Sequence, residues 1–148
     1  MRLVIGIGNE HRRDDGVGPA VARRLGQTPL PHGVRVEALA EATALLDLWR
    51  DAGQVFVIDA VRAGGRPGAI HRWDAAARPL PVHLSPLSSH GFGLAETLEL
   101  ARALRRLPPR LIIYAIEGAD FGHGPGLTPA LERAADRLLR RLMAEIST

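Results

Sequence analysis

The order of apolar segments constrains the fold of this chain more than any other feature of its sequence. Short β-branched runs alternate with longer stretches of helical spacing. The strand-like runs are Arg2–Gly6, Val34–Leu39, Gln54–Ala60, Gly68–Trp73 and Leu111–Ile116. The helix-like stretches are Val17–Leu25, Ala42–Arg50, Gly93–Leu107 and Pro129 to about Ile146. This alternation predicts an α/β fold, a three-layer α/β/α sandwich with a mostly parallel sheet.

One connection is too short for a helical crossover. The run Gly68–Trp73 begins only eight residues after Ala60, whereas a parallel connection needs roughly a dozen residues or more. We therefore expect one antiparallel strand at an edge of the sheet. Before the last helix, Thr128 is expected to act as its cap, with Pro129 in the first helical position.

The chain has 148 residues, the size of one domain, and we expect residues 1–148 to form it. The N-terminus enters a strand pattern at once, without room for a signal peptide, and no apolar run reaches about 18 residues. These features predict a cytoplasmic protein without a membrane partner. The absence of cysteine excludes disulfides, a thiolate nucleophile and a cysteine-based zinc site.

The net charge of +3 and the pI of about 10.8 invite a nucleic-acid-binding interpretation. The arginines are scattered in pairs over helix-like stretches, however, and no basic stripe is interleaved with aromatic residues. We therefore expect an ordinary solvated surface and no nucleic-acid partner.

Three polar groups fall where strands give way to loops. Asp15 follows the first strand, Asp59 ends the third, and His90 precedes the third long helix. In a sheet of parallel strands these loops open at the same end, the end at which ligands bind in α/β folds. Two carboxylates and one imidazole suit zinc, nickel or manganese and leave coordination positions open. The pattern predicts a site for a divalent metal.

Each of these residues also has a simpler interpretation. Asp15 could cap the first helix, with either Asp14 or Asp15 pointing inward. Asp59 could accept backbone hydrogen bonds from a neighbouring loop, and His90 could be a helix cap or a surface residue. The residues by themselves predict only an α/β domain with a metal site.

Two other sites are weaker hypotheses. Gly6 and Gly8 follow the first strand as in a dinucleotide-binding loop, but His11 stands at the third glycine position, and two carboxylates would repel a pyrophosphate. No P-loop sequence is present. Ser88 and Ser89 precede His90 without the G-x-S-x-G turn of a serine hydrolase.

Several short motifs resemble, in order and spacing, those of the hydrogenase maturation endopeptidases. They are Gly6-Ile7-Gly8-Asn9, Asp14-Asp15-Gly16-Val17-Gly18, Val57-Ile58-Asp59-Ala60, Ser89-His90-Gly91-Phe92-Gly93-Leu94, Ile116-Glu117 and Gly126-Leu127-Thr128-Pro129. The resemblance covers nearly the whole chain. The segment Ala63–Pro86 has no matching feature.

The resemblance implies a metal-dependent endopeptidase. Family members remove a C-terminal extension from the precursor of the nickel–iron hydrogenase large subunit after nickel insertion. By motif, Asp15, Asp59 and His90 correspond to the metal ligands and catalytic residues, while Asn9 and, more weakly, Asp14 fall where substrate approaches. Nickel is expected to arrive with the substrate, and other divalent metals are expected to be able to substitute for it. The alternative is a non-catalytic module of the same fold that binds metal or a hydrogenase subunit.

Overall fold

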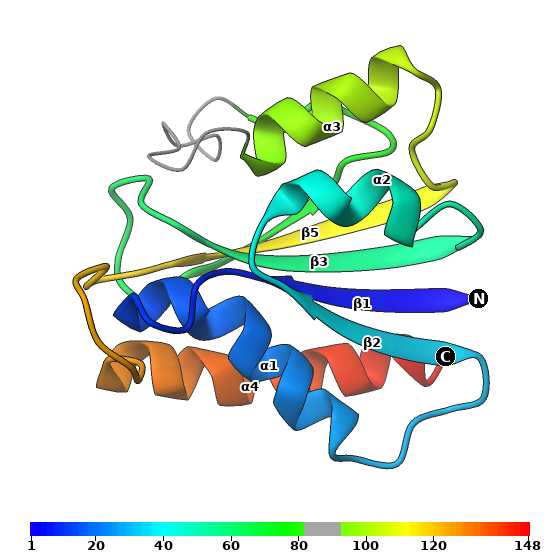
Figure 1. Cartoon of the computed structure of the whole chain (residues 1–148). Coiled ribbons are helices and arrows are strands. Elements are labelled where there is room, and N and C mark those ends of the chain that lie inside the picture. The colour runs from blue at the N-terminus through cyan, green and yellow to red at the C-terminus, as the bar shows by residue number, and fades with distance from the viewer. Residues whose placement is uncertain (82–92) are drawn as a thin grey trace.

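The central element of the structure is a five-stranded sheet with strand order β2-β1-β3-β5-β4. The computed structural model describes residues 1–81 and 93–148 (Figure 1). The strands are β1 (Arg2–Ile7), β2 (Val34–Leu39), β3 (Gln54–Val61), β4 (Ile70–Asp74) and β5 (Arg110–Glu117). All neighbouring strands are parallel except β4, which pairs antiparallel with β5 at the edge of the sheet. The predicted sheet is confirmed.

Helices cover both faces of this sheet. Figure 1 shows α1 and α4 on one face and α2 and α3 on the other, which confirms the three-layer prediction. The helical segments are η1 (Arg13–Gly16), α1 (Val17–Gly26), η2 (Ala42–Ala44), α2 (Leu45–Leu48), α3 (Leu94–Ala103) and α4 (Pro129–Ile146).

Two helices are shorter than their apolar spacing predicts. The stretch Ala42–Arg50 forms a 3-10 turn followed by a single α-helical turn. Helix α3 ends at Ala103 because Arg105 takes a left-handed backbone conformation, with φ of 56°. The Arg106 N–H then bonds to the Ala101 carbonyl at 2.8 Å, a backbone arrangement that closes a helix.

The strands bury apolar side chains on both faces. Along β3, Phe56 and Ile58 pack into the core beneath α1 and α4, whereas Val55 and Val57 pack against α2 and α3. Burial on both faces explains why this strand is continuously apolar in sequence. It also means that a polar residue on β3 can be reached by solvent only near the end of the strand.

The first turn of α1 lies directly on the ends of β1 and β3. A Cβ atom at Gly18 would lie 2.5 Å from the carbonyl oxygens of both Ile7 and Ile58, and one at Gly6 would lie 2.1 Å from the Gly18 carbonyl oxygen. Only glycine permits backbones to approach this closely. These contacts place the turn that carries Asp15 over the carboxyl end of the sheet, where the parallel strands end.

In residues 1–81 and 93–148, no helix combines the length and apolar character needed to cross a membrane.

Substitution Gly18→Ala should destabilise the protein, because its methyl group would meet two fixed carbonyl groups. We expect a loss of at least about 2 kcal/mol of unfolding free energy in urea denaturation. Gly26→Ala is the matched control, since a Cβ there meets nothing within 4 Å, and its effect should stay within about 1 kcal/mol. Equal stability of the two variants would contradict the close-packing argument.

Candidate functional site

Three connections meet at the carboxyl end of the sheet. They are the β1–α1, β3–β4 and β5–α4 connections, which gather on the left of Figure 1. Strands β3 and β5 stay paired to their last residues, Val61 and Glu117. Side chains near the ends of these two strands are therefore held in a fixed register beneath the three connections.

The two predicted carboxylates Asp15 and Asp59 lie near each other at this end. Asp59 is in register with Ala115 of β5, and by strand alternation its side chain is on the same face as Val57. Asp15 lies in η1, where its Oδ2 accepts the backbone N–H of Asn9 at 2.9 Å. Burial, and then the negative charge of Asp15, raise the pKa of Asp59 to about 8.

A pair of neighbouring carboxylates fits a divalent cation. Without a positive partner, burial of Asp59 and, to a smaller extent, the charge of Asp15 disfavour its ionised form, so Asp59 keeps a proton near neutral pH. A cation between the two groups would reverse this preference and favour both ionised forms. Oxygen ligands of this kind suit magnesium, manganese, zinc or nickel.

The third predicted ligand, His90, lies outside the described residues. Among the residues that the structure does describe, no group of three or more His, Cys, Asp or Glu side chains is arranged to hold a metal ion. The described part of the molecule thus brings together Asp15 and Asp59, and the assignment of His90 stays a prediction.

Asn9 shapes the loop that precedes Asp15. Its backbone N–H donates to the Asp15 carboxylate, and its side-chain Oδ1 accepts the His11 N–H at 2.9 Å. The side chain is half-buried. Asn9 therefore orients Asp15, and its predicted contact with substrate stays a prediction.

Asp14 has an internal role, which corrects the prediction that it contacts substrate. It is completely buried. Its carboxylate accepts the N–H groups of Ala119 (2.8 Å), Asp120 (3.0 Å) and Thr128 (2.8 Å), together with the Thr128 hydroxyl. Burial alone would raise the pKa of Asp14, but these hydrogen bonds outweigh it and hold the pKa below its ordinary value. Asp14 anchors the Asp15 turn to the β5–α4 connection.

The same hydrogen bonds correct the predicted cap of the last helix. Thr128 occupies the position before α4, and Pro129 is the first helical residue, as expected. The Thr128 side chain makes no capping bond to the helix, because its hydroxyl donates to Asp14. The Thr128 main-chain carbonyl still accepts the Glu132 N–H at 2.9 Å.

Glu117 belongs to the motif Ile116-Glu117, but the sequence predicted no role for it. Glu117 ends β5 and is only 2% exposed. Its Oε2 accepts the Ala63 N–H at 3.1 Å, and its Oε1 lies 3.4 Å from His71 Nε2. The signal that singled out Asp59, a carboxylate at the end of a buried strand, applies equally to Glu117.

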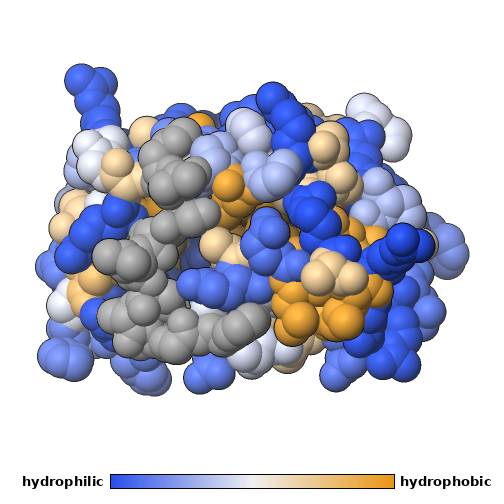
Figure 2. Space-filling view, turned by 90° about the horizontal axis from the view of Figure 1, so that it is seen from above, coloured by the Kyte–Doolittle hydropathy of each residue, from blue (hydrophilic) through white to orange (hydrophobic). Residues whose placement is uncertain are grey.

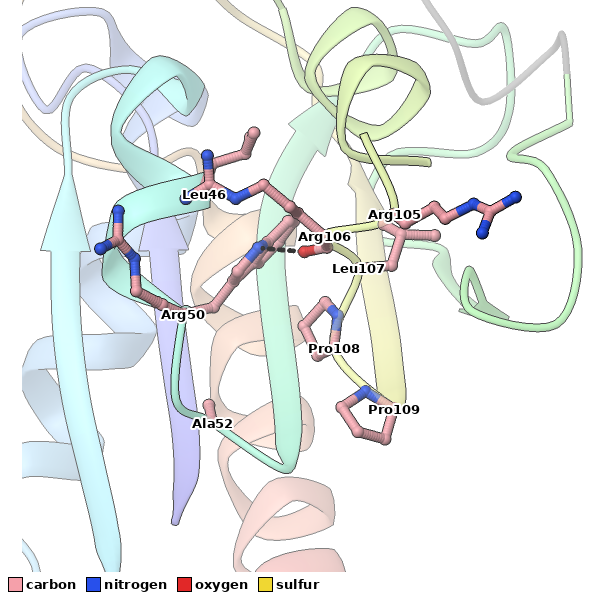
Figure 3. A pocket seen from close by; sticks show the side chains of 9 residues that line it. Leu46, Arg50, Ala52, Arg105, Arg106, Leu107, Pro108 and Pro109 are labelled. Atoms are coloured by element: carbon pink, nitrogen blue, oxygen red, sulfur yellow. Dashed lines mark hydrogen bonds between the residues drawn. The ribbon is translucent and has the colours of Figure 1, made fainter. Parts of the chain in front are cut away.

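A pocket of about 200 Å³ lies at the opposite end of the sheet, between α2 and the α3–β5 connection (Figure 3). Two of its three arginines, Arg50 and Arg106, pair with Asp47, at 3.2 and 3.6 Å. Figure 2, which looks onto the α2 and α3 face, shows apolar surface gathered at the lower right of the view. The pocket has no carboxylate or imidazole in its lining, so it is not the metal site. Its lining residues are Leu46, Trp49, Arg50, Ala52, Arg105, Arg106, Leu107, Pro108 and Pro109.

The sequence of this chain is similar to those of known proteins over nearly its whole length. A protein-family profile described as "Hydrogenase maturation protease" matches residues 20–145. The chain is 31% identical to the hydrogenase expression/formation protein HupD of Thiocapsa roseopersicina, over 92% of this chain and 66% of that protein. It is 26% identical to HupD of Rhodobacter capsulatus, over 97% of this chain and 70% of that protein.

The fold is also similar to a solved structure. The hydrogenase maturating endopeptidase HybD from E. coli superposes with a TM-score of 0.82 at 24% identity, over 99% of this chain and 91% of the other. This similarity covers the whole α/β/α arrangement of sheet and helices.

Substitution Asp14→Ala should destabilise the protein strongly, because three N–H groups and a hydroxyl would lose their buried acceptor. We expect a loss of about 3 kcal/mol or more in urea denaturation. The exposed Asp51→Ala is the control, with an effect within about 0.5 kcal/mol. A similar small effect at Asp14 would contradict its anchoring role.

The metal-free protein should lose stability as pH rises. Unfolded Asp59 ionises near its ordinary pKa, whereas folded Asp59 keeps its proton up to about pH 8, so the folded state binds more protons between these values. Asp59→Asn removes this dependence. In thermal melts with chelator, the unfolding free energy of Asp59→Asn relative to that of the parent protein should increase by on the order of 3 kcal/mol from pH 5 to pH 8. Parallel stability profiles for the two proteins would show that Asp59 is not held in its neutral form.

Proposed function

The chain belongs to the hydrogenase maturation protease family, a family of peptidases, and on this premise we propose that it cleaves a hydrogenase large-subunit precursor. The bond cut would join the mature subunit to a C-terminal extension, and the cut would follow nickel insertion. The observation that carries the proposal is the pair Asp15 and Asp59 at the carboxyl end of the sheet, where burial and then the charge of Asp15 raise the pKa of Asp59 to about 8.

Asp15 and Asp59, with His90 by resemblance, would hold a divalent cation. When bound, such an ion supplies a Lewis acid that polarises the scissile carbonyl group or lowers the pKa of a coordinated water molecule. We propose that this ion is the nickel of the precursor, so that it belongs to the substrate, and that other divalent ions can take its place.

The protein's own groups prepare this site in different ways. The Asn9 N–H holds the Asp15 carboxylate in one orientation, and the bonds of Asp14 fix the turn that carries it. Asp59 is protonated near neutral pH when no cation is present. Ligation therefore requires that Asp59 lose a proton, which makes the affinity for a divalent ion increase with pH up to about 8.

The experiment replaces each proposed ligand by alanine. Asp15→Ala, Asp59→Ala and His90→Ala should each lower cleavage of a nickel-loaded precursor by at least about 100-fold, because a three-ligand site does not survive the loss of one ligand. Mass spectrometry of the precursor C-terminus measures the cut. Thermal melts should show that the variants remain folded.

Asp136→Ala is the matched control, since this aspartate is exposed on α4, 3.5 Å from Arg24, and distant from the site. It should process the precursor at the parental rate. Retained processing in all three ligand variants would reject the metal-dependent mechanism. A parent protein that binds the precursor without cutting it would identify a binding module instead.

A further inference from the structure

The β3–β4 connection, residues 62–69, is held rigidly against the end of β5. Glu117 accepts the Ala63 N–H through its side chain and the Gly68 N–H (2.7 Å) through its backbone carbonyl. Its own N–H donates to the Ala69 carbonyl at 2.9 Å. A Cβ atom at Gly65 would lie 2.9 Å from the Glu117 carboxylate, so the connection lies directly on this buried group. Both ends of the connection, and the backbone between them, are therefore fixed.

This connection carries Arg62, whose guanidinium group is also fixed. Its Cζ lies 4.6 Å from the centroid of the Phe121 ring. Phe121 is itself held, since Arg12 Nε donates to its carbonyl at 3.2 Å and a Cβ at Gly118 would lie 2.5 Å from the ring. The Arg62 side chain is thus stacked between the end of β3 and the β5–α4 connection.

Stacking occupies the face of a guanidinium group and leaves its N–H edge available. That edge is a planar fork of donors, which matches the two oxygens of a carboxylate. Within the described residues, no ion pair involves Arg62 or its neighbour Arg66, although Arg13 pairs with Asp120, the residue next to Phe121. Arg62 is exposed.

The position of Arg62 relative to the site also favours a role in substrate binding. Arg62 is three residues beyond Asp59, which in extended backbone is about 10 Å. An extended peptide covers the same distance in about three residues. Because Asp15 is negative, it would repel an acidic segment of the substrate from this end of the sheet unless a cation such as Arg62 offsets its charge.

We propose that Arg62 binds an acidic side chain of the substrate peptide, about three residues from the bond that is cut. The inference rests on the proposed function and adds the substrate class: a peptide with an aspartate or glutamate near the cleavage site. Arg62 acts in substrate binding, and Glu117 positions the connection that carries it.

The first test compares Arg62→Gln with Arg78→Gln in the full chain. Arg78 is the matched control, since it is also exposed and stacked on an aromatic ring, at 4.3 Å from the centroid of Trp73. With a nickel-loaded precursor, Arg62→Gln should raise KM about 10-fold and leave kcat unchanged, whereas Arg78→Gln should change neither. An unchanged KM for Arg62→Gln would overturn the proposal, as would an equal increase in both variants.

The second test identifies the acidic partner. Each aspartate and glutamate within six residues of the cut in the precursor is replaced singly by its amide. One of these replacements should raise KM for the parent protein and have no further effect on Arg62→Gln. Cleavage by the Arg62→Glu variant should be restored when the precursor carries an arginine at that same position. Additive effects at every position, or a precursor cut normally without any acidic residue there, would reject the pairing.

A third measurement separates this inference from the proposed function. Calorimetric titration of a peptide spanning the cleavage site into the intact protein reports binding without cleavage. If the parent protein does not process the precursor but binds the peptide about 10-fold more tightly than Arg62→Gln does, the proposed function fails and the role of Arg62 stands. Equal affinities would reject the role of Arg62, whatever the cleavage result.

Discussion

The approach of the α1 backbone to the ends of β1 and β3 determines the geometry of everything at the carboxyl end of the sheet. Gly18 permits this approach because any side chain would meet the carbonyl groups of Ile7 and Ile58. The preceding turn is then pressed over the strand ends, with Asp14 buried and Asp15 half-exposed. The close packing that requires glycine at position 18 thus determines where the Asp15 carboxylate lies.

At Asp59, the requirements of folding stability conflict with those of the proposed chemistry. Its burial, and the neighbouring charge of Asp15, make the ionised form unfavourable in the chain by itself. A side chain that served only the fold would be uncharged at this position. The proposed function would account for its presence at the end of an otherwise apolar strand, because a bound cation would favour the ionised form.

Much of this arrangement can be predicted from local sequence. The buried runs of β1, β3 and β5 define the sheet, the short gap before β4 predicts its antiparallel direction, and Asp59 stands out as a carboxylate after an apolar run. The division of roles between Asp14 and Asp15 could not be predicted. Both are aspartates in one turn, and what distinguishes them is a set of donors more than one hundred residues later in the chain.

That long separation has a consequence for biosynthesis. The turn that carries Asp15 is synthesised more than one hundred residues before its anchor, because the Asp14 carboxylate accepts hydrogen bonds from Ala119, Asp120 and Thr128. A nascent chain that has not reached these residues lacks the hydrogen bonds that anchor the turn. The turn that carries Asp15 is therefore anchored only after synthesis has passed Thr128, so the proposed site is not yet in place in shorter nascent chains.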